Sequence, residues 1–419
     1  MGSLLLPVTY SFRIPSLHDS TPLDCRIHHP ASIVNFDPDS GAKWPRKVAI
    51  LAHPYAMLGG GFDDPIIENA GAELLAQGYI VGTFNFRHGM GAQNSSGRTS
   101  WTGKPELADY MSFAGALVCY VHALKLPGES SSPTSKTPDV NELPVQIVFG
   151  GYSYGSLVVT RLPPIDSLLA PFQSAPTSHA ASTIHQLASS LAVRTTEELV
   201  EQHDASKKQH QLSPTSPRRT FESRRKSPVT VGGYDSEPAA TAGGGKRKSQ
   251  DAGASGRRSL SLDLRRPQSW GKELRSSFHA PRHHRQQERT ATVDKRQADD
   301  LAISPAYLLI SPLLPPLSFL IAPSLAPSTA VLPSFSLSLF SSSASRSSSS
   351  NPLTMHPTLI LFGANDGFTG SKRLRAWCSK LAAEAEAEVV AGAGHFWLEA
   401  GAMRQLRGRV KTWAEGLEE

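Results

Sequence analysis

Short, continuous runs of apolar residues alternate with stretches of helical spacing along much of the chain. The runs Lys47–Ala52, Tyr79–Phe86 and Val145–Phe149 have the composition of strands that are buried on both faces. Between them, apolar residues recur at helical intervals over 65–77 and 105–124. This alternation predicts an α/β fold, with a mostly parallel central sheet covered by helices on both faces.

The same pattern predicts the elements at both ends of the chain. Alternating apolar positions over 8–14 and 23–27 predict an antiparallel hairpin. Asp64 is expected to cap the start of the helix over 65–77, because Pro65 suits the first helical position. Gly78 is expected to end this helix. The remaining expected strands are 307–312, 358–363 and 389–390, and the remaining expected helices are 156–160, 371–385 and 403–417.

Two long segments interrupt this pattern. Ser, Pro, Gln, Gly, Arg and Lys dominate 167–300, where the only helical spacing is a weak pattern near Thr183–Leu199. We expect the whole segment to be disordered, since little apolar surface offsets the ordering entropy. The segment 317–353 is rich in Ser, Pro and Leu, and we favour a gene-model artefact or disorder there, with a flexible lid as the functional alternative. One domain is therefore expected, in three parts: 1–166, a core strand in 301–316, and 354–419.

Positive charge is concentrated in the first insertion. The chain has 42 Lys and Arg against 36 Asp and Glu, and 201–300 holds half of the basic residues but a third of the acidic ones. Because the insertion lacks interleaved aromatic residues, its basicity does not indicate specific nucleic-acid binding. Ser227, Ser249 and Ser259 follow basic residues and are candidate sites for kinases and 14-3-3-type partners, with a solvated charged loop as the alternative.

Cysteine usage and hydropathy exclude other classes of protein. The three cysteines lie far apart without metal-ligand spacing, so we expect free thiols in a cytoplasmic protein and no metal site. The apolar run at the start of the chain has no basic residues before it and does not resemble a secretion signal. Prolines interrupt the apolar block 306–340, so no transmembrane segment is expected.

The strand at Val145–Phe149 leads into the sequence Gly-Tyr-Ser-Tyr-Gly, and helical sequence follows at once. A serine on such a strand-to-helix turn needs glycine neighbours, because the two backbones approach closely. Ser153 is therefore a candidate nucleophile, and the backbone N–H of Tyr154 would face an oxyanion formed beside it. A glycine-rich turn with an incidental serine is the alternative.

A serine hydroxyl needs a base that takes its proton and a third group that orients the base. His395 and Asp366 each follow a C-terminal strand, so their loops are expected at the same edge of the sheet as Ser153. The chain order Ser, Asp, His is the one associated with this kind of turn on α/β sheets. For Asp366, a turn residue in Asn-Asp-Gly is the alternative.

Two more loops leave this edge of the predicted sheet. His53 ends a central strand and is the strongest rival for the role of base, but its loop is expected to bring a second backbone N–H, of Tyr55 or Ala56, toward the reacting carbonyl. His53 would then line the site, and a structural turn is the alternative. Arg87 and His88 follow another strand and are further candidates to line the site, although we favour a structural role for them.

The segments HPYAMLGGG, NFRHGMG, GYSYGS, GAND and GAGHFW, in this order, resemble the α/β-hydrolase superfamily. Within it they are most similar to the serine hydrolases grouped with dienelactone hydrolases and X-Pro dipeptidyl peptidases. The likeness covers 5–165 and 301–419, although His88 stands where relatives usually have Gly, a difference expected to narrow the pocket. The resemblance implies an α/β-hydrolase fold without metal or organic cofactor, a nucleophile, base and acid at Ser153, His395 and Asp366, and an oxyanion hole at the N–H groups of Tyr154 and Tyr55.

These observations predict a serine hydrolase that cleaves an ester or related acyl bond of a small-molecule substrate through an acyl-enzyme. Peptidase, thioesterase and lipase activities stay open, because pocket shape depends on loop packing. The alternative from another class is a non-catalytic hydrolase-like scaffold whose basic insertion binds partners in a phosphorylation-dependent way.

Overall fold

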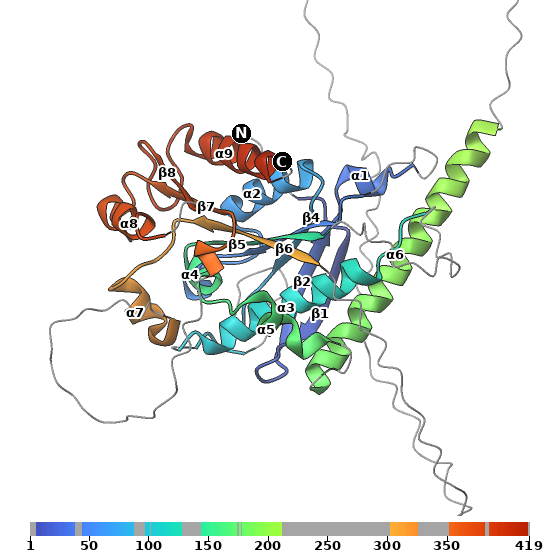
Figure 1. Ribbon diagram of the computed structural model, residues 1–419, viewed down its shortest axis with the longest axis horizontal. Coiled ribbons are helices and arrows are strands. Elements are labelled where there is room, and N and C mark those ends of the chain that lie inside the picture. Colours follow the sequence, from blue (N-terminus) through green and yellow to red (C-terminus); the bar gives the residue numbers. More distant parts are fainter. Residues whose placement is uncertain are drawn as a thin grey trace, which may run out of the picture. The chain divides into compact units, whose positions relative to one another are not determined.

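Eight strands of the described chain form a single sheet (Figure 1). The structure is a computed structural model that describes residues 6–37, 44–87, 97–100, 102–127, 144–173, 176, 178–211, 302–325, 352–381 and 385–417. The chain divides into two units, Met1–Asp204 with Ser277–Glu419, and Ala205–Ser276. The whole sheet lies in the first unit, and the described residues of the second are 205–211, at the end of a helix.

The sheet is antiparallel at one edge and parallel everywhere else. Its order is β1-β2-β4-β3-β5-β6-β7-β8, in which β2 runs antiparallel to both β1 and β4 and all later neighbours pair in parallel. The predicted opening hairpin and the predicted parallel sheet are therefore confirmed. The strands are β1 Tyr10–Pro15, β2 Pro22–His28, β3 Lys47–Ala52, β4 Ile80–Phe84, β5 Val145–Tyr152, β6 Ile303–Ile310, β7 Thr358–Gly363 and β8 Ala385–Val390.

Helices occupy the connections between the strands. The α-helices are α1 Ala31–Val34, α2 Pro65–Ala76, α3 Lys104–Ala123, α4 Tyr154–Val159, α5 Ile165–Leu169, α6 His179–Gln211, α7 Leu317–Ile321, α8 Ser371–Cys378 and α9 Ala402–Gly416. Short 3-10 turns are η2 Ala56–Leu58, η3 Ala170–Phe172, η4 Pro323–Leu325 and η5 Pro352–Thr354. As predicted, Asp64 caps α2, since its carboxylate accepts a hydrogen bond from the backbone N–H of Ile66 at 2.9 Å.

Successive residues of the central strands enter cores on opposite faces of the sheet. In β3, Val48 and Ile50 belong to one apolar cluster, and Ala49 and Leu51 belong to the other. Helices α3, α4 and α6 contribute to the first cluster, and α2 and α9 cover the second (Figure 1). Because both faces are covered, these strands read as continuous apolar runs and not as alternating patterns.

The boundary between α8 and β8 differs from the prediction. The sequence pattern predicts a helix over 371–385 and a strand of two residues at 389–390, but α8 ends at Cys378 and β8 begins at Ala385. The Ala-Glu repeat in this region has high helix propensity. It forms a strand because six residues from Ala385 to Val390 pair with β7, so tertiary pairing overrides propensity here.

The expectation of disorder from residue 167 onward is wrong for the first part of that segment. α5, η3 and α6 are ordered, and the residues of α6 that are buried recur at helical spacing: Ala180, Ala181, Ile184, Ala188, Leu191, Ala192, Thr195 and Leu199. Several of them are alanines, which contribute weakly to a hydrophobic pattern yet pack closely. Residues 212–301 lie outside the described chain, as do 326–351 of the second predicted insertion, whose residues 317–325 form α7 and η4.

A buried polar network joins α6 to the first strands and to α3. The hydroxyl of Tyr120 lies 2.7 Å from Nε2 of His29 and 2.9 Å from the hydroxyl of Thr195 on α6. Tyr10 of β1 donates to the carboxylate of Glu198 at 2.6 Å. Because each of these groups has a partner, the polar contacts fix the position of α6 on the sheet without leaving an uncompensated donor.

Two further features bear on the predictions from sequence. Cys25, Cys119 and Cys378 are all free thiols, as expected. Among the described helices, none combines the length and the apolar character that a membrane span requires.

Burial of three histidines predicts that the protein loses stability in mild acid. Burial lowers the pKa of His28, His29 and His53 from an ordinary value of 6.5 to about 4. The native state keeps these histidines neutral between the two values, while the unfolded chain binds protons. The free energy of unfolding therefore falls as the pH drops from 6.5 toward 4, and each of the three histidines contributes to the fall.

Urea unfolding at a series of pH values measures this slope. The variant His29→Gln is expected to show a shallower dependence than the wild type. The control His179→Gln, at an exposed position of α6, is expected to match the wild type. Equal slopes for all three proteins would contradict the explanation.

Candidate functional site

Ser153 lies on a strained turn between β5 and α4. Its φ of 54° and ψ of −109° are unusual for a residue with a side chain. A Cβ on Gly151 would lie 2.3 Å from the carbonyl carbon of Gly155, and a Cβ on Gly155 would lie 2.3 Å from the carbonyl oxygen of Ala52. Both positions therefore require glycine, as the sequence pattern predicts.

The turn is fastened to the end of β6. The backbone N–H of Ser153 donates to the carbonyl of Ile310 at 2.8 Å. The side chain of Ser156 bonds across the same two strands, because its hydroxyl lies 2.5 Å from the carbonyl of Gly151 and accepts from the N–H of Ile310 at 3.0 Å. These bonds hold the strained conformation in place and present the hydroxyl of Ser153 at the carboxyl edge of the sheet.

The structure brings the side chains of Ser153, His395 and Asp366 together. Nε2 of His395 lies 2.9 Å from Oγ of Ser153, and Nδ1 lies 2.8 Å from Oδ2 of Asp366. The three residues are 6 %, 5 % and 4 % exposed. Because a carboxylate only accepts hydrogen bonds, Nδ1 carries the proton and Nε2 is left as the acceptor for the serine hydroxyl.

Asp366 is held by the backbone of its own loop. Its second oxygen, Oδ1, accepts from the N–H groups of Phe368 at 2.8 Å and Thr369 at 3.0 Å. Both carboxylate oxygens are therefore engaged, one by the loop and one by His395. This arrangement fixes the direction from which the carboxylate meets the imidazole.

A buried tyrosine and a pair of strained residues position the histidine loop. The hydroxyl of Tyr152 donates to the carbonyl of His395 at 3.0 Å, and burial raises the pKa of this phenol, which keeps it a donor. Trp397 and Ser311 have φ values of 56° and 46°, and the indole N–H of Trp397 donates to the hydroxyl of Ser311 at 3.1 Å. Both are buried, so this bond joins the histidine loop to the end of β6.

Two phenylalanines frame the imidazole of His395. The ring of Phe368 lies 4.3 Å from it between centroids at an interplanar angle of 31°. Phe396 meets it edge-on at 5.4 Å and 88°. The rings restrict the imidazole to one orientation. Tyr152, Phe396 and Trp397 lie within the quoted motifs GYSYGS and GAGHFW, but no role was predicted for them, or for Phe368 and Ser311, because these roles depend on contacts between loops that are far apart along the chain.

His53, the rival candidate for the base, is fully buried. Its hydrogen bonds go to Phe86 and Pro54 and not to Ser153. Its Nε2 accepts from the N–H of Phe86 at 2.9 Å, and its Nδ1 lies 2.6 Å from the carbonyl of Pro54. With both ring nitrogens engaged in this way, His53 ties its loop to the end of β4. The loop carries Tyr55, whose ring lies 5.2 Å from that of Tyr154 between centroids.

Arg87 belongs to a buried ion-pair network and not to the site. Its guanidinium contacts Asp109 at 2.7 Å and Asp19 at 2.9 Å, and these hydrogen bonds and charges raise its pKa and lower that of Asp19. The structural role that we favoured for it therefore agrees with its contacts. His88 lies outside the described residues. Within the described chain, no group of three or more His, Cys, Asp or Glu side chains is placed to hold a metal ion.

Comparison with known proteins gives structural likenesses of low sequence identity. No protein-family model matches the chain, and no curated protein matches it. An α/β serine hydrolase homologue from Coxiella burnetii is 12% identical, with 97% of each chain covered and a TM-score of 0.42. An α/β serine hydrolase without a lid from Xanthomonas campestris is 12% identical, with 99% of this chain and 97% of that chain covered and a TM-score of 0.44. Esterase 2 from Thermogutta terrifontis, phosphorylated by paraoxon, is 11% identical, with 98% and 95% covered and a TM-score of 0.44.

All three TM-scores are below 0.5, and the fold is defined instead by the chain's own architecture. The sheet is mostly parallel with an antiparallel β2, and the strained serine turn follows β5. The aspartate loop follows β7, and the histidine loop follows β8. This order of strands and loops is that of the α/β-hydrolase fold, which this chain therefore has.

Proposed function

We propose that the protein is a serine hydrolase that cleaves an ester or related acyl bond. The observation that carries the proposal is the continuous hydrogen-bonded path from Ser153 through His395 to Asp366, with distances of 2.9 and 2.8 Å. A path of this kind is what an alcohol needs in order to act as a nucleophile at neutral pH. It stands in a strained turn, and such strain is concentrated at functional sites.

In the proposed reaction, Oγ of Ser153 attacks the acyl carbon while Nε2 of His395 takes its proton. Asp366 stabilises the imidazolium that forms. His395 then gives the proton to the leaving alkoxide, so the alcohol departs and an acyl-enzyme remains. Water, deprotonated by His395, attacks the acyl group, and return of the proton to Ser153 releases the acid.

The negative oxygen of each tetrahedral intermediate would be held by backbone N–H groups of Tyr154 and Tyr55. Tyr154 is the first residue of α4, so its N–H has no carbonyl four residues earlier within the helix to bond to. Tyr55 precedes η2 on the loop that His53 fastens, and its ring lies beside that of Tyr154. Rigid support of both donors is what stabilisation of a developing charge requires.

A non-catalytic scaffold is the less favoured reading, because the full set of nucleophile, base and acid is present in bonding geometry. The candidate modification sites Ser227, Ser249 and Ser259 lie outside the described residues, so partner binding by the insertion stays a separate prediction. A cytoplasmic location is part of the proposal and is supported by the three free cysteines.

Labelling with a fluorophosphonate probe tests the nucleophile. The wild type is expected to take up one covalent label, and Ser153→Ala is expected to take up none, since the attacking oxygen is missing. Hydrolysis of short p-nitrophenyl esters should fall by about 10⁴-fold or more in Ser153→Ala and by about 10⁴-fold in Asp366→Asn. Ser156→Ala is not a suitable control, because that hydroxyl holds the turn. A folded wild type that takes up no label would refute the proposal.

Loss of the indole N–H at position 397 is expected to slow the reaction without unfolding the protein. Trp397→Phe removes the bond to Ser311 and loosens the histidine loop, and a neutral hydrogen bond contributes about 1 kcal/mol, so labelling should slow about fivefold. The second-order labelling rate measures this effect, and thermal unfolding monitors the fold. Trp413→Phe, a buried tryptophan of α9, is the matched control and should retain the wild-type rate. Equal rates for all three proteins would show that the bond does not position His395.

Replacement of 212–301 by a flexible Gly-Ser linker is expected to keep the esterase activity. The replacement leaves α6 in place, which is essential because α6 buries apolar residues in the core. A longer deletion from residue 170 would remove those residues and is expected to unfold the protein. Ester turnover and circular dichroism of both variants provide the measurements, and loss of turnover in a folded linker variant would assign the insertion a role in the reaction.

A further inference from the structure

Exposed apolar side chains gather at the edge of the sheet that carries Ser153. They follow four parallel strands: Met57 and Leu58 after β3, Leu320 after β6, Phe368 after β7, and Phe396 and Leu398 after β8. We call these six residues the apolar rim. Since the carboxyl ends of parallel strands meet at one edge, their loops surround the serine turn that follows β5.

Contacts and chain neighbours place four members of the apolar rim beside residues of the site. Phe368 and Phe396 contact the imidazole of His395, and their rings lie 5.5 Å apart between centroids. Met57 and Leu58 belong to η2, directly after Tyr55, whose ring contacts Tyr154.

The rim is far more exposed than a buried substrate pocket would be. Its members are between 37 % and 86 % exposed, and Phe319 beside Leu320 is 40 % exposed. Elsewhere in the described chain, the exposed large apolar residues are four valines and Met355. Large apolar side chains gathered on one surface mark a site of contact with a partner or with a membrane.

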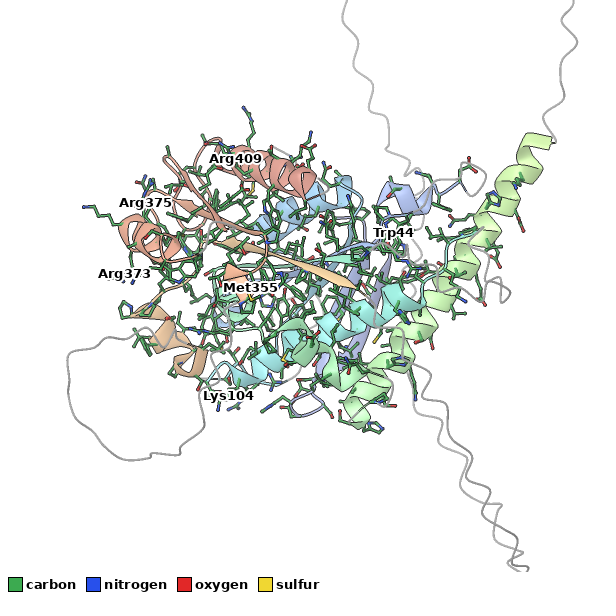
Figure 2. All side chains as sticks on the ribbon, viewed as in Figure 1. Trp44, Lys104, Met355, Arg373, Arg375 and Arg409 are labelled. Atoms are coloured by element: carbon green, nitrogen blue, oxygen red, sulfur yellow. The ribbon has the colours of Figure 1, made fainter. Side chains whose placement is uncertain are left out.

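Positive charge adjoins the rim. Lys372, Arg373 and Arg375 are exposed residues of α8, and Figure 2 shows Arg375 extending outward from this helix. Phe368, Lys372 and Arg373 share a hollow of about 630 Å³ at the start of α8. Arg373 also donates to the carbonyl of Pro315 at 2.9 Å, which joins the basic helix to the segment leading into α7.

Acidic groups near the rim do not cancel this charge. Glu399, next to Leu398, accepts a hydrogen bond from the backbone of Gly394, which lowers its pKa and keeps it ionised, so it sets one negative charge against the three cations of α8. Asp63, on the loop after η2, pairs with Arg26. Among these described residues, the three cations of α8 therefore outnumber Glu399, the one acidic group that has no basic partner among them.

We infer that the apolar rim and the cations of α8 bind an anionic lipid surface. Apolar side chains would enter the boundary between headgroups and acyl chains, while Lys372, Arg373 and Arg375 would contact the negative headgroups. The consequence for catalysis rests on the proposed function: Ser153 would then act on esters held in that surface. A protein partner with an apolar face is the other occupant, and the test separates the two.

Sedimentation with vesicles of phosphatidylcholine, with and without phosphatidylserine, tests the inference on the full-length protein. The wild type is expected to bind, and more strongly when phosphatidylserine is present. Leu320→Ser/Leu398→Ser should lower the partition coefficient by about tenfold or more, because two large apolar side chains no longer enter the lipid. Lys372→Gln/Arg375→Gln should lower binding to the anionic vesicles by about fivefold per cation removed and leave binding to neutral vesicles unchanged.

The matched control is Val193→Ser/Met355→Ser, which removes two exposed apolar side chains away from the rim and should bind like the wild type. Equal loss in the rim and control variants would overturn the inference. Equal vesicle binding by the wild type and the rim variant would also overturn the inference. Binding would then be attributed to the basic segment 201–300. Absence of vesicle binding, together with dimerisation that Leu320→Ser/Leu398→Ser abolishes, would assign the rim to a second copy of the chain instead.

Two measurements keep this inference separate from the proposed function. Ser153→Ala should bind vesicles as the wild type does, whatever its activity. Leu320→Ser/Leu398→Ser should hydrolyse a short, water-soluble ester at the wild-type rate. Failure of the wild type to hydrolyse any ester would refute the proposed function. The vesicle experiment would still show whether the apolar rim binds lipid.

Discussion

The close approach of three backbone segments at the serine turn is the constraint on which the site depends. β5, α4 and the end of β3 meet where side chains cannot fit, as the 2.3 Å separation between a Cβ at Gly155 and the carbonyl of Ala52 demonstrates. The chain satisfies this constraint by placing Ser153 at positive φ, a conformation that costs about 1–3 kcal/mol and is supported by bonds to Ile310. The strain therefore resides in the residue whose hydroxyl is proposed to react.

The three functional side chains come from separate loops, and buried polar contacts between those loops set their relative positions. Tyr152, next to Ser153, bonds to the carbonyl of His395, and Trp397 bonds to the residue that follows β6. These contacts act on the backbone of the histidine loop, whereas Phe368 acts on the imidazole ring itself. The position of His395 therefore depends on two separate sets of contacts, one to the backbone of its loop and one to its imidazole ring. A substitution can disturb either set without the other.

Sequence predicted the sheet and the residues at its edge because strong local signals mark both. Continuous apolar runs mark the strands, and Gly151 and Gly155 mark a turn that only glycine permits. Prediction failed where local preference and tertiary pairing disagree: the Ala-Glu repeat before Val389 has helix propensity but pairs with β7. α6 was underestimated because much of its buried face is alanine. No role was predicted for Trp397 or Ser311, since each positions the histidine loop only through its hydrogen bond to the other.

The separation of the site along the chain has a consequence for synthesis on the ribosome. Ser153 and His395 are 242 residues apart, so at a usual elongation rate the serine emerges about 12–50 s before its partner. The hydrogen bonds that hold its turn come from Ile310, which is also made after the long insertion. When β5 has just been synthesised, the nascent chain therefore contains Ser153 but not β6, whose residue Ile310 holds the serine turn. The reactive geometry arises only when the final third of the polypeptide is complete.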